Sequence, residues 1–384
     1  MNRRQVLTTT ALATLAPFTT GCLRSGTRSN QTPRNWRQFG RDATHAATAT
    51  DRGVPRSVET GEQHSLDGDA ATSPVIGATD AFAADERGLF VAPFDTDRTP
   101  GHVPLPGATP RVPAVDTDGR VVATRETDAG PSVVAVHPRD RRVVWERRLD
   151  GTVVTAPAVA DGVVYAATDT GGVALDAATG DARWRVDARV TPGEWDRLAT
   201  MNLAPAVTDD TVVFPTGDGV VAVSRGGVER WRVDCRRVRA APAARDGVVY
   251  VPDLGVGLRA VDLDTGRELW QHTTEETWAT PAVGSRRVFV GTVAGLSVLD
   301  RETGTLRQVM DQRVGLIPSA VAVVGGVVVT ATREASLLAV TLVGDRTAPI
   351  QSRGEGGFGA PAVASGRYVF TEYTADGFRL SVAG

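Results

Sequence analysis

Histidine and cysteine are the residues of this chain best suited to hold a metal or to attack a substrate. The histidines show no metal-ligand spacing, whereas zinc sites combine His or Cys at short intervals. They are His45, His64, His102, His137 and His272. We therefore expect no metal site, and we place these histidines at the surface or in turns. Cys235 follows a tryptophan in a strand-like stretch, so we expect a small buried hydrophobe rather than a reactive thiol.

Two acidic clusters and two glycine-rich runs have the composition of ligand-binding loops. Asp116-Thr-Asp118-Gly119 and Asp262-Leu-Asp264-Thr-Gly266 lack the third ligand and the distal Glu of a calcium loop, so we expect turns. Gly354–Gly359 and Gly255–Ala260 match a dinucleotide-binding pattern, but neither leads into a helix that could face a phosphate. No Gly-x-Ser-x-Gly elbow is present. The sequence therefore predicts no enzyme activity, no catalytic residue and no cofactor.

The composition is that of a soluble globular chain with a large core. The 384 residues are 41% hydrophobic and 23% charged, with 41 glycines and 22 prolines. All 42 basic residues are arginine, and the formal net charge is −3. A nucleic-acid binder should be basic, so we exclude nucleic acid as a partner.

Residues 1–22 have the form of an export signal that ends in a lipidation site. Arg3 and Arg4 precede a mildly apolar stretch, as in twin-arginine signals. Cys22 follows a glycine, which resembles a lipobox in which the cysteine is acylated. Residues 23–35 are rich in Ser, Arg, Thr, Asn and Pro and are expected to form a flexible tether. We expect an exported lipoprotein, anchored by Cys22 to the outer face of the cytoplasmic membrane.

A short motif, Pro-Ala-Val or a close variant, occurs in eight copies. The copies start at Pro74, Pro113, Pro157, Pro205, Pro242, Pro281, Ser319 and Pro361. Their spacing of 37 to 48 residues is close to the ~40 to 50 residues of one four-stranded propeller blade. After the motif, turns such as Asp161-Gly162 lead into β-branched runs. The predicted fold is all-β: residues 36–384 form an eight-bladed propeller of four-stranded antiparallel blades.

Tryptophan occurs late in the repeat unit. Trp184 and Trp270 lie four residues after a turn glycine, and Trp145 and Trp231 match them in position. The unit resembles the repeat of the pyrroloquinoline-quinone-type propellers, a family that includes BamB-like lipoproteins and quinoprotein dehydrogenases. The resemblance implies eight blades, with each tryptophan docked between neighbouring blades. Such burial stabilises a ring by about 1.5 to 3 kcal/mol for each tryptophan.

Some units depart from the repeat. Gln308 and Ile350 stand where blades six and seven should have tryptophan, and the first blade has none, so these blades are expected to be irregular. The last unit, from Pro361, has room for only three strands, so residues 60–66 are expected to supply its fourth strand and close the ring. Residues 36–40 resemble the lead-in of this family and are expected to pack against the ring.

The resemblance also raises a remote alternative, a quinone-dependent dehydrogenase. Those enzymes are much longer, stack the quinone on adjacent cysteines and bind calcium through Glu, Asn and Asp near the axis. This chain has one cysteine in its body, Cys235, and one asparagine beyond the tether, Asn202, so the parts of that site are missing. The absence of lysine, together with the export signal and the blades, indicates a haloarchaeal lipoprotein of the BamB-like family.

Two loops combine tryptophan with charged residues, and exposed aromatic residues rimmed by charge suit partner binding. The candidate partner-binding residues are Glu194, Trp195, Asp196, Glu275, Glu276 and Trp278. The same tryptophans could instead tuck into the ring as packing. We predict a non-catalytic, monomeric ring that acts as a protein-protein interaction scaffold for an unknown envelope protein. The alternative is a module that binds a small molecule or a sugar at the mouth of the central channel.

Overall fold

The computed structural model describes residues 36–49, 60–66, 71–95, 97–105, 111–191, 203–273, 277, 279–293, 295–310, 320–332, 337–343, 346–353, 359–364 and 366–383. The predicted export signal with Arg3, Arg4 and Cys22 lies outside these residues, as does the tether. All six candidate partner-binding residues also lie outside them. No helix in the described part of the chain is long and apolar enough to cross a membrane.

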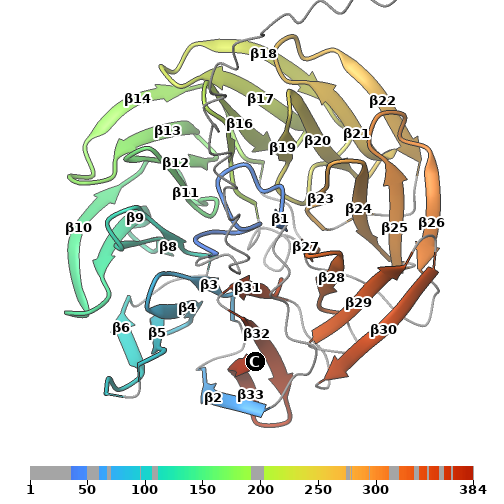
Figure 1. Ribbon diagram of the computed structural model, residues 1–384. Helices are drawn as coiled ribbons and strands as arrows, with labels where there is room; N and C mark the ends of the chain where they lie inside the picture. The colour runs from blue at the N-terminus through green and yellow to red at the C-terminus, as the bar shows by residue number, and fades with distance from the viewer. Residues whose placement is uncertain are drawn as a thin grey trace, which may run out of the picture. The chain divides into compact units, whose positions relative to one another are not determined.

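Eight sheets surround one axis and form an eight-bladed propeller, which confirms the predicted fold (Figure 1). Blade 1 comprises β3 (Val75–Ile76), β4 (Asp80–Asp85), β5 (Gly88–Pro93) and β6 (Gly101–Pro104). Blade 2 comprises β7 (Ala114–Val115), β8 (Val121–Thr127), β9 (Gly130–His137) and β10 (Arg142–Arg148). Blade 3 comprises β11 (Ala158–Ala160), β12 (Val163–Thr168), β13 (Gly171–Asp176) and β14 (Ala182–Val186). Blade 4 comprises β15 (Ala206–Val207), β16 (Thr211–Thr216), β17 (Gly219–Ser224) and β18 (Glu229–Asp234).

The second half of the ring follows the same plan. Blade 5 comprises β19 (Ala243–Arg245), β20 (Val248–Asp253), β21 (Gly257–Asp262) and β22 (Glu268–Thr273). Blade 6 comprises β23 (Ala282–Val283), β24 (Arg287–Thr292), β25 (Gly295–Asp300) and β26 (Leu306–Met310). Blade 7 comprises β27 (Ala322–Val324), β28 (Val327–Thr330), β29 (Leu337–Val343) and β30 (Arg346–Arg353), with β1 (Thr48–Ala49) parallel to β27. Blade 8 comprises β31 (Ala362–Ala364), β32 (Arg367–Thr374), β33 (Gly377–Ala383) and β2 (Thr60–Ser65).

The strands nearest the axis and those in mid-blade form the core, because neighbouring blades cover both of their faces. Every residue of β12 is buried, whereas the outermost strand of the same blade, β14, has only half-buried and exposed residues. The Asp-Gly turns form as predicted. Asp161 and Asp246 have φ of 48° and 47°, and the glycine after each also has a positive φ, as a two-residue type I′ turn requires.

An N-terminal strand closes the ring, as predicted. The strand β2 pairs antiparallel with β33 on the outside of blade 8, with His64 opposite Leu380. Blade 8 therefore combines strands from both ends of the propeller, and this pairing covers the outer edge of β33.

The strand register corrects two predicted positions in blade 7. Val321, not Ser319, occupies the position of the motif proline. Ala322 pairs with Val329 in the same way that Ala158, which follows the motif proline of blade 3, pairs with Tyr165. The tryptophan position belongs to Gln351, which pairs with Ala339; Ile350 is the extra residue of the bulge that every regular outer strand contains at this point. Local sequence matching missed both positions, because blade 7 does not keep the spacing of the other repeats. Gln308 does occupy the tryptophan position of blade 6.

Candidate functional site

Residues 36–49, the axial segment, run along the inner ends of the blades on one face of the ring (Figure 1). An innermost strand has an unpaired edge toward the axis, and its amide groups need partners. In seven blades the third residue of the repeat motif donates its backbone N–H to this segment. The bonds run from Ile76 to Trp36 O (2.7 Å), Val115 to Arg37 O (2.6 Å), Val159 to Gln38 Oε1 (2.9 Å), Val207 to Ala43 O (2.6 Å), Ala244 to Thr44 O (2.7 Å), Val283 to Ala46 O (2.8 Å) and Val323 to Ala47 O (2.8 Å).

At blade 3 a side chain takes the place of the backbone. Gln38 Nε2 donates to Val159 O at 2.8 Å, and Gln38 Oε1 accepts the Val159 N–H, so the amide side chain bonds as a peptide unit would. The backbone turns away at this point, with φ of 63° at Gly40 and 83° at Arg41. A glycine is needed at position 40, because an added Cβ would lie 2.7 Å from the Cα of His45.

Two side chains of the axial segment fill the centre of the ring. Phe39 is 3% exposed and clusters with the alanines that precede the repeat motif in five blades, namely Ala156, Ala204, Ala241, Ala320 and Ala360. Its ring meets the ring of His45 edge-on, with centroids 5.8 Å apart. Trp36 is also only 3% exposed, so the predicted packing of residues 36–40 against the ring is confirmed. Small side chains around the axis leave the space that Phe39 takes.

The burial of His45 corrects the prediction that the histidines lie at the surface or in turns. His45 is 0% exposed, and its Nδ1 lies 3.0 Å from Pro242 O. No local pattern marks this position as buried, because the contacts come from blades far away in sequence. Burial lowers the pKa of His45 to about 4, because desolvation outweighs the hydrogen bond to the Pro242 carbonyl and the attraction of Asp42.

Stability should therefore fall in acid through His45. The unfolded imidazole binds a proton below a pH of about 6.5, whereas the folded one binds it only below about 4. Unfolding thus takes up a proton between these values, and the free energy of unfolding decreases as pH falls, by about 3 kcal/mol in all. Urea denaturation from pH 7.5 to pH 4 measures this decrease. His45→Gln should flatten the slope, while His137→Gln, at a side chain that is 39% exposed, should not; equal slopes in both variants would refute the assignment.

The four predicted docking tryptophans lie at successive joints between blades 2 and 6. Each indole Nε1–H donates to a backbone carbonyl of the next blade: Trp145 to Ala177 (3.0 Å), Trp184 to Arg225 (2.8 Å), Trp231 to Leu263 (2.7 Å) and Trp270 to Arg301 (3.0 Å). Each ring lies against a turn glycine with positive φ, at Gly180, Gly227, Gly266 and Gly304. An added Cβ there would meet the indole at 2.5 to 2.8 Å, so the repeat requires tryptophan and glycine as a pair.

At the joint between blades 1 and 2 the large and the small residue exchange positions. Gly101 of β6 pairs with Val91 at the tryptophan position, and Arg141, with φ of 50°, stands at the turn-glycine position of blade 2. The Arg141 guanidinium reaches back over Gly101 and donates to Thr99 O. A long side chain therefore crosses this joint from the opposite blade.

Combining Gly101→Trp with Arg141→Gly, which restores the usual pair, should affect the free energy of unfolding cooperatively. In Gly101→Trp alone, the new indole cannot lie flat against residue 141, because the arginine side chain is still there. Arg141→Gly alone loses the hydrogen bond to Thr99 O. The double variant should recover a favourable coupling of about 1 to 2 kcal/mol, because the indole then lies on a glycine. A double-mutant cycle by urea denaturation measures the coupling, and additive single effects would contradict the exchange of roles.

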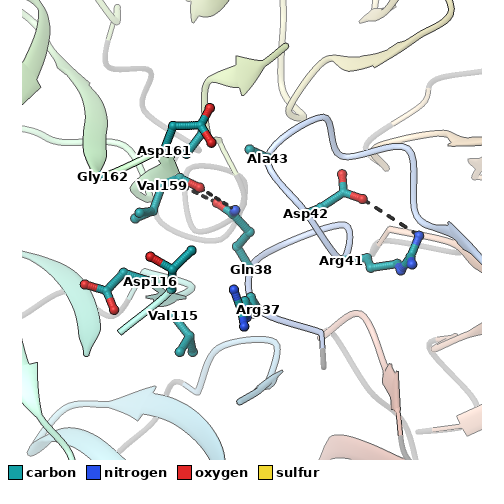
Figure 2. Close-up of a pocket in the computed structure, with 12 residues that line it drawn as sticks. Arg37, Gln38, Arg41, Asp42, Ala43, Val115, Asp116, Val159, Asp161 and Gly162 are labelled. Carbon is teal, nitrogen blue, oxygen red and sulfur yellow. Dashed lines mark hydrogen bonds and ion pairs between the residues drawn. The ribbon is translucent and has the colours of Figure 1, made fainter. Parts of the chain in front are cut away.

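A pocket of about 310 Å³ opens beside the axial segment (Figure 2). Its walls come from the axial segment, from residues 115–117 of blade 2 and from residues 159–162 of blade 3. Figure 2 shows Gln38 reaching Val159, and Arg37 beside the inner strand that contains Val115. The pocket therefore combines charged groups with the small apolar side chains of the two inner strands.

The described residues do not fit a quinone and calcium site. Phe39 and His45 fill the axis, near which the family resemblance places the calcium ligands. Cys235 is buried as predicted, at 7% exposure, and burial raises the pKa of its thiol to about 12. It has no adjacent cysteine on which a quinone could stack. Among the described residues no group of three or more His, Cys, Asp or Glu side chains could hold a metal ion.

The two predicted partner-binding loops join the outermost strand of one blade to the innermost strand of the next. One connects β14 to β15, between the buried Val190 and Leu203, and the other connects β22 to β23, beside the buried Ala279. Each inner strand begins at such a connection and ends at the turn that meets the axial segment. The strand ends joined by the loops therefore lie on the face opposite the axial segment.

A family model described as outer membrane protein assembly factor BamB matches residues 91–232 and 195–380. The chain belongs to this family. BamB of Yersinia pestis is 27% identical over 221 residues, which cover 52% of this chain and 55% of that protein. The serine/threonine-protein kinase AfsK of Streptomyces griseus is 33% identical over 135 residues, 32% of this chain and 16% of the kinase. The chain thus spans about half or less of these relatives.

Two solved structures support the BamB-like fold. BamB from Moraxella catarrhalis has a TM-score of 0.62 and 16% identity, and covers 85% of this chain and 100% of that one. The quinohemoprotein alcohol dehydrogenase of Comamonas testosteroni has a TM-score of 0.70 and 13% identity, and covers 93% of this chain and 81% of the enzyme. At these identities the structures share a fold with the BamB-like chain, and the fold hosts more than one function.

Proposed function

We propose that this protein is a non-catalytic propeller that serves as an interaction scaffold for another protein of the cell envelope. Its membership of the BamB family supports an envelope role. The observation that carries the proposal is the filled axis: Phe39 and His45 occupy the centre of the ring. The axial segment thus closes one mouth of the channel and leaves the faces and loops of the ring for binding.

The proposal includes export through Arg3 and Arg4, and an anchor at Cys22 on the outer face of the cytoplasmic membrane. The axial segment begins at Trp36 on one face of the ring. The opposite face, where the strands flanking Trp195 and Trp278 end, would then be free to bind the partner as a monomeric ring. If the source is haloarchaeal, which stays a prediction, assembly of outer-membrane proteins is not the role, because archaea lack that membrane.

Capture of the partner tests the scaffold. The full chain would be crosslinked in its native membranes and purified, and the proteins that accompany it identified by mass spectrometry. We expect one reproducible, near-stoichiometric protein. Replacing residues 192–202 with a shorter Gly-Ser linker, between the buried anchors Val190 and Leu203, should abolish its capture with little change in melting temperature.

A matched control lies on the other face of the ring. Val228 is 68% exposed in a turn of blade 4 on the axial-segment side, so Val228→Ser should leave capture unchanged. Recovery of the propeller alone would refute the scaffold. Equal capture by the linker variant would show that the loop at residues 192–202 has no role in binding the partner.

A further inference from the structure

Among the described residues that line the pocket beside the axial segment, one charged side chain has no partner. Asp116 pairs with Arg120 at 2.6 Å, and Asp161 pairs with Arg225 at 3.2 Å. Two further charged groups are engaged within the segment: Arg41 Nη1 donates to Thr48 O at 2.7 Å, and Asp42 Oδ1 accepts from Thr44 Oγ1 at 2.7 Å. The half-buried Arg37 side chain makes no hydrogen bond or ion pair with any residue that the structure describes.

We propose that this pocket binds a monocarboxylate with a short apolar group, and that Arg37 pairs with the carboxylate. The site does not depend on the scaffold role, because it lies on the other face from the strand ends that the candidate partner-binding loops join. A guanidinium presents its donors in a planar fork that matches a carboxylate in two parallel bonds. Of the charged residues described in the pocket, Arg37 is the one free to do so.

The neighbouring carboxylates limit the charge of the ligand. Asp116 cannot turn to Arg37, because its Oδ2 accepts from Arg120 Nε and its Oδ1 accepts the backbone N–H groups of Asp118 and Arg120 at 2.8 Å. Asp42 and Asp161 add negative charge at the rim. A dianion such as phosphate would meet more repulsion than a monoanion, so the arrangement favours one negative charge.

The apolar wall and the volume limit the size of the ligand. Val115, Val159 and Ala160 line the pocket together with the charged residues. The backbone of Val159 is held by both amide atoms of Gln38, and that of Val115 by Arg37 O, so the wall is formed before a ligand arrives. A volume of about 310 Å³ is at the small end of the ~300 to 1,000 Å³ of ligand pockets and suits a chain of a few carbons.

Calorimetric titration of the full chain with butyrate tests the site. Butyrate should bind saturably, while butyramide, butylamine and inorganic phosphate should bind at least tenfold more weakly. Arg37→Gln should weaken butyrate binding at least tenfold without changing the melting temperature, because the Arg37 bond to Val115 is made by the backbone. Arg37→Lys should lose part of the affinity, since it retains the charge without the fork.

Arg142 provides the matched control, because its side chain is 61% exposed on the outer strand β10. Arg142→Gln should bind butyrate like the unaltered protein. The proposal is overturned if butyrate shows no saturable binding, if phosphate or butyramide binds as well, or if Arg37→Gln binds butyrate equally. None of these results depends on capture of the envelope partner.

A carboxylate of this kind could come from a free organic acid or from the C-terminus of another protein. A tripeptide that ends in valine, compared with its C-terminal amide and with butyrate, separates these sources. Tenfold tighter binding of the free-acid peptide than of butyrate would identify a protein C-terminus. Equal or tighter binding of butyrate would identify a free acid. Tight binding of the amidated peptide would overturn the role of the carboxylate.

Discussion

Replacing Phe39 with alanine is expected to lower the free energy of unfolding by about 3 to 5 kcal/mol. Phe39 is 3% exposed and lies in a cluster with alanines of five blades, none of which has side-chain length to refill the axis. The change therefore leaves a cavity where alanines of five blades meet. Equilibrium denaturation in urea measures the loss.

Two variants show whether the cavity is the cause. Phe39→Leu retains most of the volume and should cost about 1.5 kcal/mol or less. Val228→Ala removes two methyl groups from a side chain that is 68% exposed, and should change stability by less than about 0.5 kcal/mol. If Phe39→Ala is as stable as Val228→Ala, the axial segment does not hold the blades together.

Replacing Trp231 with alanine is the second large effect we expect, again about 3 to 5 kcal/mol. Trp231 is 8% exposed, donates to Leu263 O at 2.7 Å and lies flat on Gly266. The variant removes buried area and leaves the Leu263 carbonyl of the next blade without its donor. Because blades 4 and 5 meet through this contact, urea denaturation should register the whole loss as a lower midpoint.

The indole bond can be separated from the packing. Trp231→Phe retains most of the buried area and loses the hydrogen bond, so it should cost about 1 to 2 kcal/mol. Gln308 occupies the same register in blade 6, and Gln308→Ala should cost less than about 1 kcal/mol, because a half-buried amide has less area to lose. Equal losses of unfolding free energy in Trp231→Ala and Gln308→Ala would mean that a docked tryptophan stabilises the joint between blades no more than a glutamine does.

The repeat made most of the fold predictable. Its predictable parts depend on short sequence patterns that act within one blade or between two neighbours. These parts are the eight motif copies from Pro74 to Pro361, the Asp-Gly turns and the strand at residues 60–66. The prediction failed by one or two residues at Ser319 and Ile350, because blade 7 departs from the spacing of the repeat. The candidate loop residues Trp195 and Trp278 stay a prediction.

The amino-acid sequence by itself determined the number of blades, their order and the way the ring closes, because a periodic chain repeats the same local interactions. Only the tertiary structure decided what happens at the axis. The axial segment occurs once, and the partners of Gln38, Phe39 and His45 come from blades separated from it by more than one hundred residues. The unpaired charge of Arg37 is equally a product of folding, since its neighbours Asp116 and Asp161 are paired by residues of their own blade and the next.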